Sequence, residues 1–477
     1  MNKVEEKTII KSNTILGGTK VLDIAVGIVR NKAVSILIGA AGMGTLALYQ
    51  STSDLISTIA NLGTSTTAVK NISTAYVKDD IDKTSFVVTA FHKIVRLTGF
   101  FALLICILTS PILSYINFGD YSHIFDFFLL SISLFELQLV AGYTTLLQGC
   151  RKFVIMSKAT LVGHILGLFI CVPLYYFLRF NAIIPVLVVY PFVSYIVLKR
   201  FSKKLTLKSV RVSYSEAFKY GRDMIKTGFY ICLQSLFSML YLYILRLYLS
   251  NSGGLLIVGL FSAGMLLVNQ YVGLVFTSMG TEYYPRLSTI DRMEDFVQAI
   301  NMQIKRCMLI LAPLISFMIL CMPLVIRILY TVEFLPVVSF AIIMLASVGF
   351  KIIEWCIGFS FIAKGRTNVL FINEATFKIY LLILSVFLYN ILGLFGIGVA
   401  YLIAEFCFSI QSIVVFKRLW HYSFNNQNMY TVGLNILLIL ICMSINLKYD
   451  GSIKILGTII ILIIQLIFLF NYLKSLR

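Results

Sequence analysis

Apolar segments long enough to cross a bilayer recur along the whole chain and constrain its fold more than any other feature. Hydrophobic residues make up 59% of the 477 residues and charged residues only 13%, whereas soluble domains are about 45–50% apolar and about 25% charged. The mean hydropathy is +0.91. A membrane β-barrel would instead show alternating segments of about ten residues. We therefore predict an all-α polytopic membrane protein.

The apolar segments and the polar breaks between them give the number of spans. Since a transmembrane helix uses about 20 apolar residues, the chain has room for about 14 of them. We expect spans near residues 13–38, 43–69, 90–116, 122–149, 153–178, 181–199, 224–250, 254–281, 304–330, 334–362, 367–391, 395–416, 429–447 and 453–473. No cleavable signal peptide is expected, because the polar residues 1–11 lead directly into a full-length span.

Lysine and arginine are concentrated in every second loop. The alternate loops contain little beyond Arg179, Lys448 and Lys454. Cytoplasmic loops carry the excess of cations, so we predict that both termini are cytoplasmic. This asymmetry accounts for most of the net charge of +19. Without a soluble basic domain, the charge does not indicate nucleic-acid binding.

A long cytoplasmic break and two glycine spacings suggest a duplicated six-span unit. We predict a first lobe over residues 1–200, a linker over 201–223, a second lobe over 224–418 and two extra spans over 419–477. Gly149 and Gly365 lie 216 residues apart, and Gly44 and Gly259 lie 215 apart. Copies with an even number of spans share one orientation, which makes this a parallel repeat. Chance similarity of short glycine turns is the alternative.

The remaining motifs favour a transporter over an enzyme or a channel. The four histidines are scattered and the nine cysteines form no C-x-x-C pair, so no metal site, catalytic group or cofactor is indicated. No phosphate-gripping glycine loop is present, and the chain therefore has no ATPase motif. No repeated pore loop of the kind that channels use is visible.

Charged residues within predicted spans are the candidate site residues, because they are costly in a bilayer and usually face a polar cavity. Arg30, Lys32 and Arg246 lie in the outer halves of equivalent spans. Cations facing one cleft favour an anionic substrate, and arginine suits phosphate. The alternative is that Lys32 and Arg246 extend to the outer headgroups.

Two lysine–glutamate couples have helical spacing. Lys351 and Glu354 are three residues apart, and Glu374 and Lys378 are four apart, so each couple can pair on its own helix face. In one interpretation the lysine and the glutamate only neutralise each other's charge. In the other the pair is a switch that separates when a phosphate binds the lysine.

Three further carboxylates have no obvious partner on the same helix: Asp54, Glu136 and Glu405. They are candidates for ion coupling or gating, together with the glutamates of the two couples. Hydrogen bonding to a polar group on another helix is the alternative. Coupling to H⁺ or to Na⁺ is left open.

Residues 38–44 read IGAAGMG, and similar features are found at 259–264, at 284–288 and at 362–364 followed by Glu374. In their order and spacing, these motifs resemble those of the Wzx-type polysaccharide flippases of the MATE-like MOP exporter superfamily. The resemblance covers about the first twelve spans. Lys32, Arg246 and Glu374 match charged positions in the lipid III flippase, whereas Arg30 and Glu405 are not placed by the resemblance.

The resemblance implies a fold and a function. The fold would be two six-helix lobes in a V with a cationic central cavity, plus two C-terminal helices. The function would be flipping of an undecaprenyl-diphosphate-linked oligosaccharide, an O-antigen or related repeat unit, across the bacterial inner membrane by alternating access. Its partners would be this lipid-linked glycan, membrane lipid, an O-antigen polymerase and a chain-length regulator.

Two other functions remain as alternatives. A MATE-type exporter of small cationic drugs shares the two-lobe fold and predicts an acidic cavity. A glycan polymerase or ligase ordinarily needs a long periplasmic loop, but all the predicted outward breaks are short.

Overall fold

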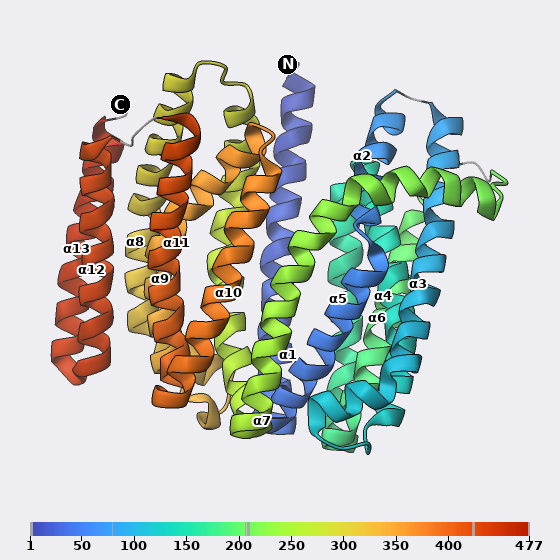
Figure 1. The fold of residues 1–477 in the computed structure, drawn as a ribbon, viewed down its shortest axis with the longest axis horizontal. Coiled ribbons are helices and arrows are strands. Elements are labelled where there is room, and N and C mark those ends of the chain that lie inside the picture. Colours follow the sequence, from blue (N-terminus) through green and yellow to red (C-terminus); the bar gives the residue numbers. More distant parts are fainter. Residues whose placement is uncertain (1–2, 79, 206, 208–209, 422–424, 476–477) are drawn as a thin grey trace. The chain divides into compact units, whose positions relative to one another are not determined.

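The computed structural model describes residues 3–78, 80–205, 207, 210–421 and 425–475. Apart from short turns, these residues are helical (Figure 1), which confirms the predicted all-α class. Within the described residues the helices are α1 (Lys3–Asn61), α2 (Thr64–Val77), α3 (Ile81–Phe118), α4 (Ile124–Gly149), α5 (Phe153–Leu178), the 3₁₀ helix η1 (Arg179–Ala182), α6 (Ile183–Ser202), α7 (Tyr214–Ser288), α8 (Met293–Leu329), the 3₁₀ helix η2 (Val332–Phe334), α9 (Val337–Ala363), α10 (Thr367–Leu392), α11 (Leu394–Trp420), α12 (Asn426–Lys448) and α13 (Gly451–Ser475).

Ten stretches of the described residues are long and apolar enough to cross a membrane. One of them, Phe153–Ser202, contains both α5 and α6. The predicted spans at 153–178 and 367–391 agree with α5 and α10 to within one residue. Helix α1, which contains the first predicted span and most of the second, is not among the ten.

The helices pack as two compact units, one ending at Gly259 and the other beginning at Leu260. The first contains α1 to α6 and the first arm of α7, and the second contains the rest of α7 and α8 to α13. The predicted linker, 201–223, includes the segment between the end of α6 and the start of α7, but its second part, 214–223, belongs to α7. The lobe boundaries placed at that linker stay a prediction.

Helix α9 lies at the centre of the second unit. It packs against α8, α10, α11 and α12, and 78% of its apolar window is buried, the highest share among the ten stretches. A helix that is hydrophobic on all sides is expected in such a core position. Charged residues on α9 are therefore held away from lipid by neighbouring helices.

Each unit of the predicted repeat contains one sharp kink at a glycine. Gly39 has φ 67° and ψ −171°, and Gly254 has φ 76° and ψ 175°. Each kink joins two helical arms within α1 or α7. Because only glycine adopts this left-handed region without a steric cost, the conformation explains the residue type. The kinks lie 215 residues apart, which is the spacing of Gly44 and Gly259.

The second glycine spacing does not mark equivalent positions. At the end of α4 the left-handed residue is Arg151, with φ 56°, whereas at the end of α9 it is Gly365, with φ 69°. The next amide donates five residues back in both turns, from Lys152 to Leu147 and from Arg366 to Phe361. Such a bond, with a left-handed residue before it, is the usual helix-ending motif. These two turns are 214 residues apart, so matching Gly149 with Gly365 is wrong by two positions.

The arms of α1 and α7 cross closely within the first unit at the other glycine pair. A Cβ atom added to Gly44 would collide with the carbonyl oxygen of Leu255, and one added to Gly259 would collide with the carbonyl oxygen of Ala40. Small residues allow helix backbones to approach in this way. The crossing therefore requires glycine on both helices.

Replacing Gly44 with alanine should destabilise the protein, because the new Cβ meets backbone that cannot rotate away. Overpacking of this kind costs about 1–3 kcal/mol. The melting temperature in detergent measures the effect. Gly433→Ala on α12, where nothing lies within 4 Å of the added Cβ, is the matched control. Equal melting temperatures for the two variants would contradict the close crossing.

Candidate functional site

Five charged side chains interact electrostatically in the second unit. Lys351 and Glu354 come from α9, Glu374 and Lys378 from α10, and Glu405 from α11. Glu354 interacts with the other four, and so does Lys378. We call these five residues the charged cluster. The sequence predicted two separate couples on single helices, whereas the structure joins both couples with Glu405.

The charged cluster contains three carboxylates and two ammonium groups. With all five groups ionised its net charge is −1. An unbalanced charge is costly in a low-dielectric interior, so uptake of a single proton or monovalent cation would neutralise the cluster. Among the described residues, no three His, Cys, Asp or Glu side chains are arranged to hold a metal ion. The assignment of the three glutamates to ion coupling or gating stays a prediction.

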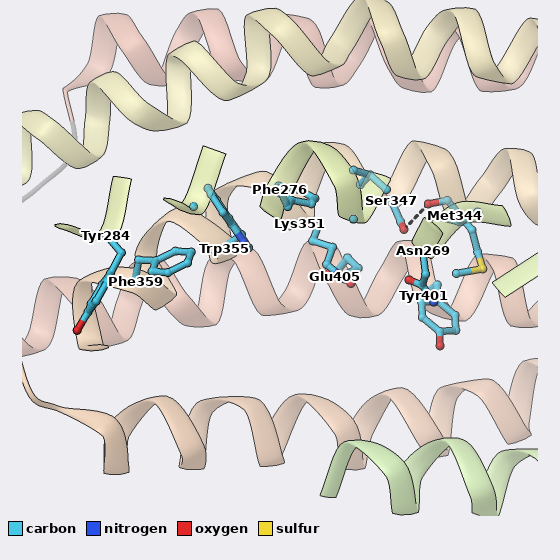
Figure 2. A pocket seen from close by; sticks show the side chains of 14 residues that line it. Asn269, Phe276, Tyr284, Met344, Ser347, Lys351, Trp355, Phe359, Tyr401 and Glu405 are labelled. Carbon is cyan, nitrogen blue, oxygen red and sulfur yellow. Dashed lines mark hydrogen bonds between the residues drawn. The ribbon is translucent and has the colours of Figure 1, made fainter. Parts of the chain in front are cut away.

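A cavity of about 550 Å³ lies beside the charged cluster, and Lys351 and Glu405 line it (Figure 2). Aromatic rings form the wall at one end. The centroids of Trp355 and Phe359 are 4.9 Å apart, and Phe276 from α7 lies 5.0 Å from Trp355. These rings come from α7 and α9 and contact one another, so they present a continuous apolar surface.

The other end of the cavity is polar. Asn269, Ser347 and Tyr401 lie there (Figure 2). The hydroxyl of Ser347 donates to the carbonyl of Met344 at 2.7 Å, so only its lone pairs remain for a ligand. Ligand-binding pockets of about 300–1,000 Å³ commonly combine an apolar lining with a few polar groups. The cavity therefore suits a ligand with both apolar and charged or hydroxylated parts.

Glu405 lines the cavity, and the hydrogen-bonding capacity of its side chain is not fully used. It is 3% exposed, and within the described residues its Oε2 atom is buried without a hydrogen-bond partner. A buried acceptor left without a partner costs about 1–3 kcal/mol, and more when it is charged. A bound proton, cation or ligand hydroxyl would remove this cost.

In the first unit, Arg30 belongs to a chain of four interacting side chains. Its guanidinium carbon lies 5.6 Å from the ring centroid of Tyr190, and Nη1 donates to the tyrosine hydroxyl at 3.4 Å. The Tyr190 ring stacks on His164 at 5.9 Å. Nδ1 of His164 contacts the carboxylate of Asp23. The sequence does not indicate that His164 pairs with Asp23, because the two residues are 141 positions apart and each shows only as a polar residue within an apolar run.

A second ionic contact in the first unit links α1 with the first arm of α7. Arg246 interacts electrostatically with Asp54, and its Nη1 atom donates to the carbonyl of Ala47 at 3.4 Å. Asp54 is exposed rather than enclosed. This residue, which has no obvious partner on its own helix, thus has one on another helix.

The other two predicted site residues of the first unit lie apart from that contact. Lys32 is half-buried on α1, and its backbone carbonyl accepts from Ser35 at 2.9 Å. Glu136 on α4 is 7% exposed, and its Oε2 has no hydrogen-bond partner within the described part of the chain. The role of each predicted site residue in binding or coupling stays a prediction.

Comparison with known proteins establishes the fold. No family model and no curated protein matches the chain. Among solved structures, it is similar to the lipid II flippase MurJ in an inward closed conformation, with a TM-score of 0.71 and 15% identity over 98% of this chain and 100% of that one. It is also similar to an inward-facing multidrug resistance MATE family transporter of the MOP superfamily, with a TM-score of 0.63 and 14% identity over 84% and 94%.

A MATE transporter of Vibrio cholerae gives a TM-score of 0.60 and 13% identity over 89% of this chain and 98% of that one. At these identities the likeness shows a shared fold. The chain therefore has the helical membrane-transporter fold found in these flippase and MATE structures.

Removing a cation from the charged cluster should harm the protein far more than removing a carboxylate. Lys378→Met leaves three carboxylates with one ammonium group, and breaking a buried ionic arrangement costs about 3–5 kcal/mol. Glu405→Gln keeps the side-chain shape and leaves two charges of each sign. We expect a large fall in the melting temperature for Lys378→Met and a small change for Glu405→Gln. The reverse order would show that the cluster is not held by charge balance.

Proposed function

We propose that the protein is a flippase that moves an undecaprenyl-diphosphate-linked oligosaccharide, an O-antigen or related repeat unit, across the bacterial inner membrane. It works by alternating access, from the cytoplasmic to the periplasmic leaflet, and both termini are cytoplasmic. The polyprenyl tail stays in the bilayer throughout. Only the polar head then needs a protected path, because an isolated diphosphate in hydrocarbon would cost many kcal/mol.

The observation that carries the proposal is a half-buried lysine on the wall of a cavity inside an apolar helical unit. Lys351 lines the cavity together with the aromatic wall of Trp355 and Phe359. An ammonium group in this position replaces hydration that a phosphate or an acidic sugar loses. Aromatic rings contact the apolar faces of sugars while nearby amide and hydroxyl groups form hydrogen bonds.

The extent of the structural match adds support. The match to the lipid II flippase covers nearly all of both chains, 98% and 100%, whereas the matches to the two MATE transporters cover 84% and 89% of this chain. The match to the lipid II flippase thus covers a larger share of this chain than the matches to the two MATE proteins do.

The residues proposed to bind the diphosphate or the glycan lie in both units. They are Arg30, Lys32 and Arg246 in the first and Lys351 and Lys378 in the second. The proposed coupling and gating carboxylates are Asp54, Glu136, Glu354, Glu374 and Glu405. Protonation or cation binding at these carboxylates would release their paired cations to the substrate.

One observation favours a different function, the export of small organic cations. The charged cluster has one more carboxylate than ammonium groups, and the buried Oε2 atom of Glu405 belongs to a residue that lines the cavity. A cationic drug with an aromatic part would satisfy both Glu405 and the aromatic wall. The two proposals therefore differ in the sign of the substrate charge.

Deletion of the gene in its own host tests the flippase proposal. We expect lipid-diphosphate-linked oligosaccharide to accumulate on the cytoplasmic leaflet and surface glycan to disappear. The wild-type gene should reverse both effects. An Arg30→Ala copy should not, and neither should a copy with the double change Lys351→Met, Glu354→Gln, which keeps the net charge of the charged cluster at −1. The protein levels of both copies should hold.

Lys417→Gln, a change in the last turn of α11 outside the proposed site, is the control variant and should restore surface glycan fully. Normal surface glycan in the deletion strain, with increased sensitivity to cationic dyes, would refute the flippase and favour the drug exporter.

A further inference from the structure

A second, smaller pocket lies in the first unit, and none of the proposed binding or coupling residues lines it. Its volume is about 170 Å³, whereas a single water needs only about 10–15 Å³. We call it the rim pocket. Its walls come from the end of α2, the start of α3, the turn between α4 and α5 and the segment after α6. On the predicted orientation all four segments lie at the cytoplasmic surface.

The groups that line the rim pocket favour an anion. Lys152 and Lys204 are the charged residues that line it, and within the described part of the chain no carboxylate does so. Thr84 already donates its hydroxyl to the carbonyl of Asp80 at 2.8 Å. The ammonium groups and the hydroxyl of Tyr76 are therefore the donors that remain. A phosphate oxygen is a strong acceptor for donors of this kind.

The position of Lys152 is set by its neighbours. Its ammonium nitrogen lies 5.8 Å from the ring centroid of Tyr76, and its backbone amide donates to the carbonyl of Leu147 at 2.9 Å. Both contacts hold the residue between α2 and α4. A lysine whose backbone and side chain are fixed in this way loses less conformational freedom when it binds an anion.

The rim pocket also has apolar walls. Ile81, Leu205 and Leu207 line it beside the lysines, and the two leucines pack against a core cluster that includes Val87 and Phe91. A free inorganic anion gains no favourable contact from such an apolar surface. The mixture of two cations and an aliphatic wall fits a phosphate that is attached to a hydrocarbon-bearing group.

The residue before Lys152 strengthens the case. Arg151 occupies a left-handed position, with φ 56°, which disfavours any side chain, whereas the corresponding turn of the second unit has Gly365 there. The Arg151 guanidinium donates to Ser73 at 3.4 Å, one turn before Tyr76 on α2. The strained backbone thus carries a third cation next to the rim pocket.

We propose that the rim pocket binds the phosphate headgroup of an anionic phospholipid from the cytoplasmic leaflet. Lys152 and Lys204 hold the phosphate, and Ile81 and Leu207 contact the glycerol and the first acyl carbons. Basic groups on the cytoplasmic side of membrane helices commonly recognise anionic headgroups. This site is independent of the proposed function, because it requires no particular transported substrate.

Titration of the purified full-length protein in detergent with dioctanoyl phosphatidylglycerol, followed by native mass spectrometry, tests the proposal. We expect one saturable site, weakened about fivefold by Lys204→Gln and about 25-fold by the double variant Lys152→Gln, Lys204→Gln. Arg151→Gly should also weaken binding, but without lowering the melting temperature, because glycine relieves the left-handed strain.

The control double variant Lys70→Gln, Lys203→Gln removes the same charge from exposed positions that do not line the pocket and should bind as the wild type does. Equal weakening in both double variants would mean general surface attraction and would overturn the proposal. Inorganic phosphate that competes at the affinity of the lipid would overturn it in favour of a free-anion site. Equal binding of dioctanoyl phosphatidylcholine would also overturn it.

Discussion

Charge is costly inside an apolar helical bundle, and this cost explains where several ionised groups of the described residues lie. They interact with groups of opposite sign or with polar partners on neighbouring helices. In the second unit, five such residues on α9, α10 and α11 interact with one another. In the first unit, Arg246 interacts with Asp54 and Arg30 with Tyr190. In each arrangement, interactions with neighbouring charged or polar groups offset part of the cost of placing an ionised side chain in the bundle.

Glycines determine the bends of α1 and α7 and the close contact between these two helices. Kinks at Gly39 and Gly254 each join two helical arms, and the contact between Gly44 and Gly259 brings α1 and α7 together within the first unit. The first arm of α7 also contacts this part of α1, because Arg246 interacts with Asp54 and donates to the carbonyl of Ala47.

The sequence predicts the helices well because apolar length and polar breaks are local properties. It also indicates the couples formed by Lys351 with Glu354 and by Glu374 with Lys378, because helical spacing is local too. Packing between helices that are distant in the sequence is not a local property. Asp23 and His164 are 141 residues apart, and neither shows in the sequence that the other is its partner. For the same reason the sequence shows no partner for Glu405 on its own helix and does not identify one on another helix. The glycine spacing also places the register of the repeat two residues away at one of its two glycine pairs.

Transport by the purified protein in liposomes tests whether it flips a lipid-linked oligosaccharide. The readout is the fraction of a fluorescent polyprenyl-diphosphate-linked oligosaccharide that becomes accessible to a glycosidase added outside. We expect a protein-dependent increase that unlabelled polyprenyl diphosphate inhibits and that the double variant Lys351→Met, Glu354→Gln abolishes. No increase for the lipid-linked oligosaccharide, together with protein-dependent movement of a small organic cation, would contradict the flippase proposal.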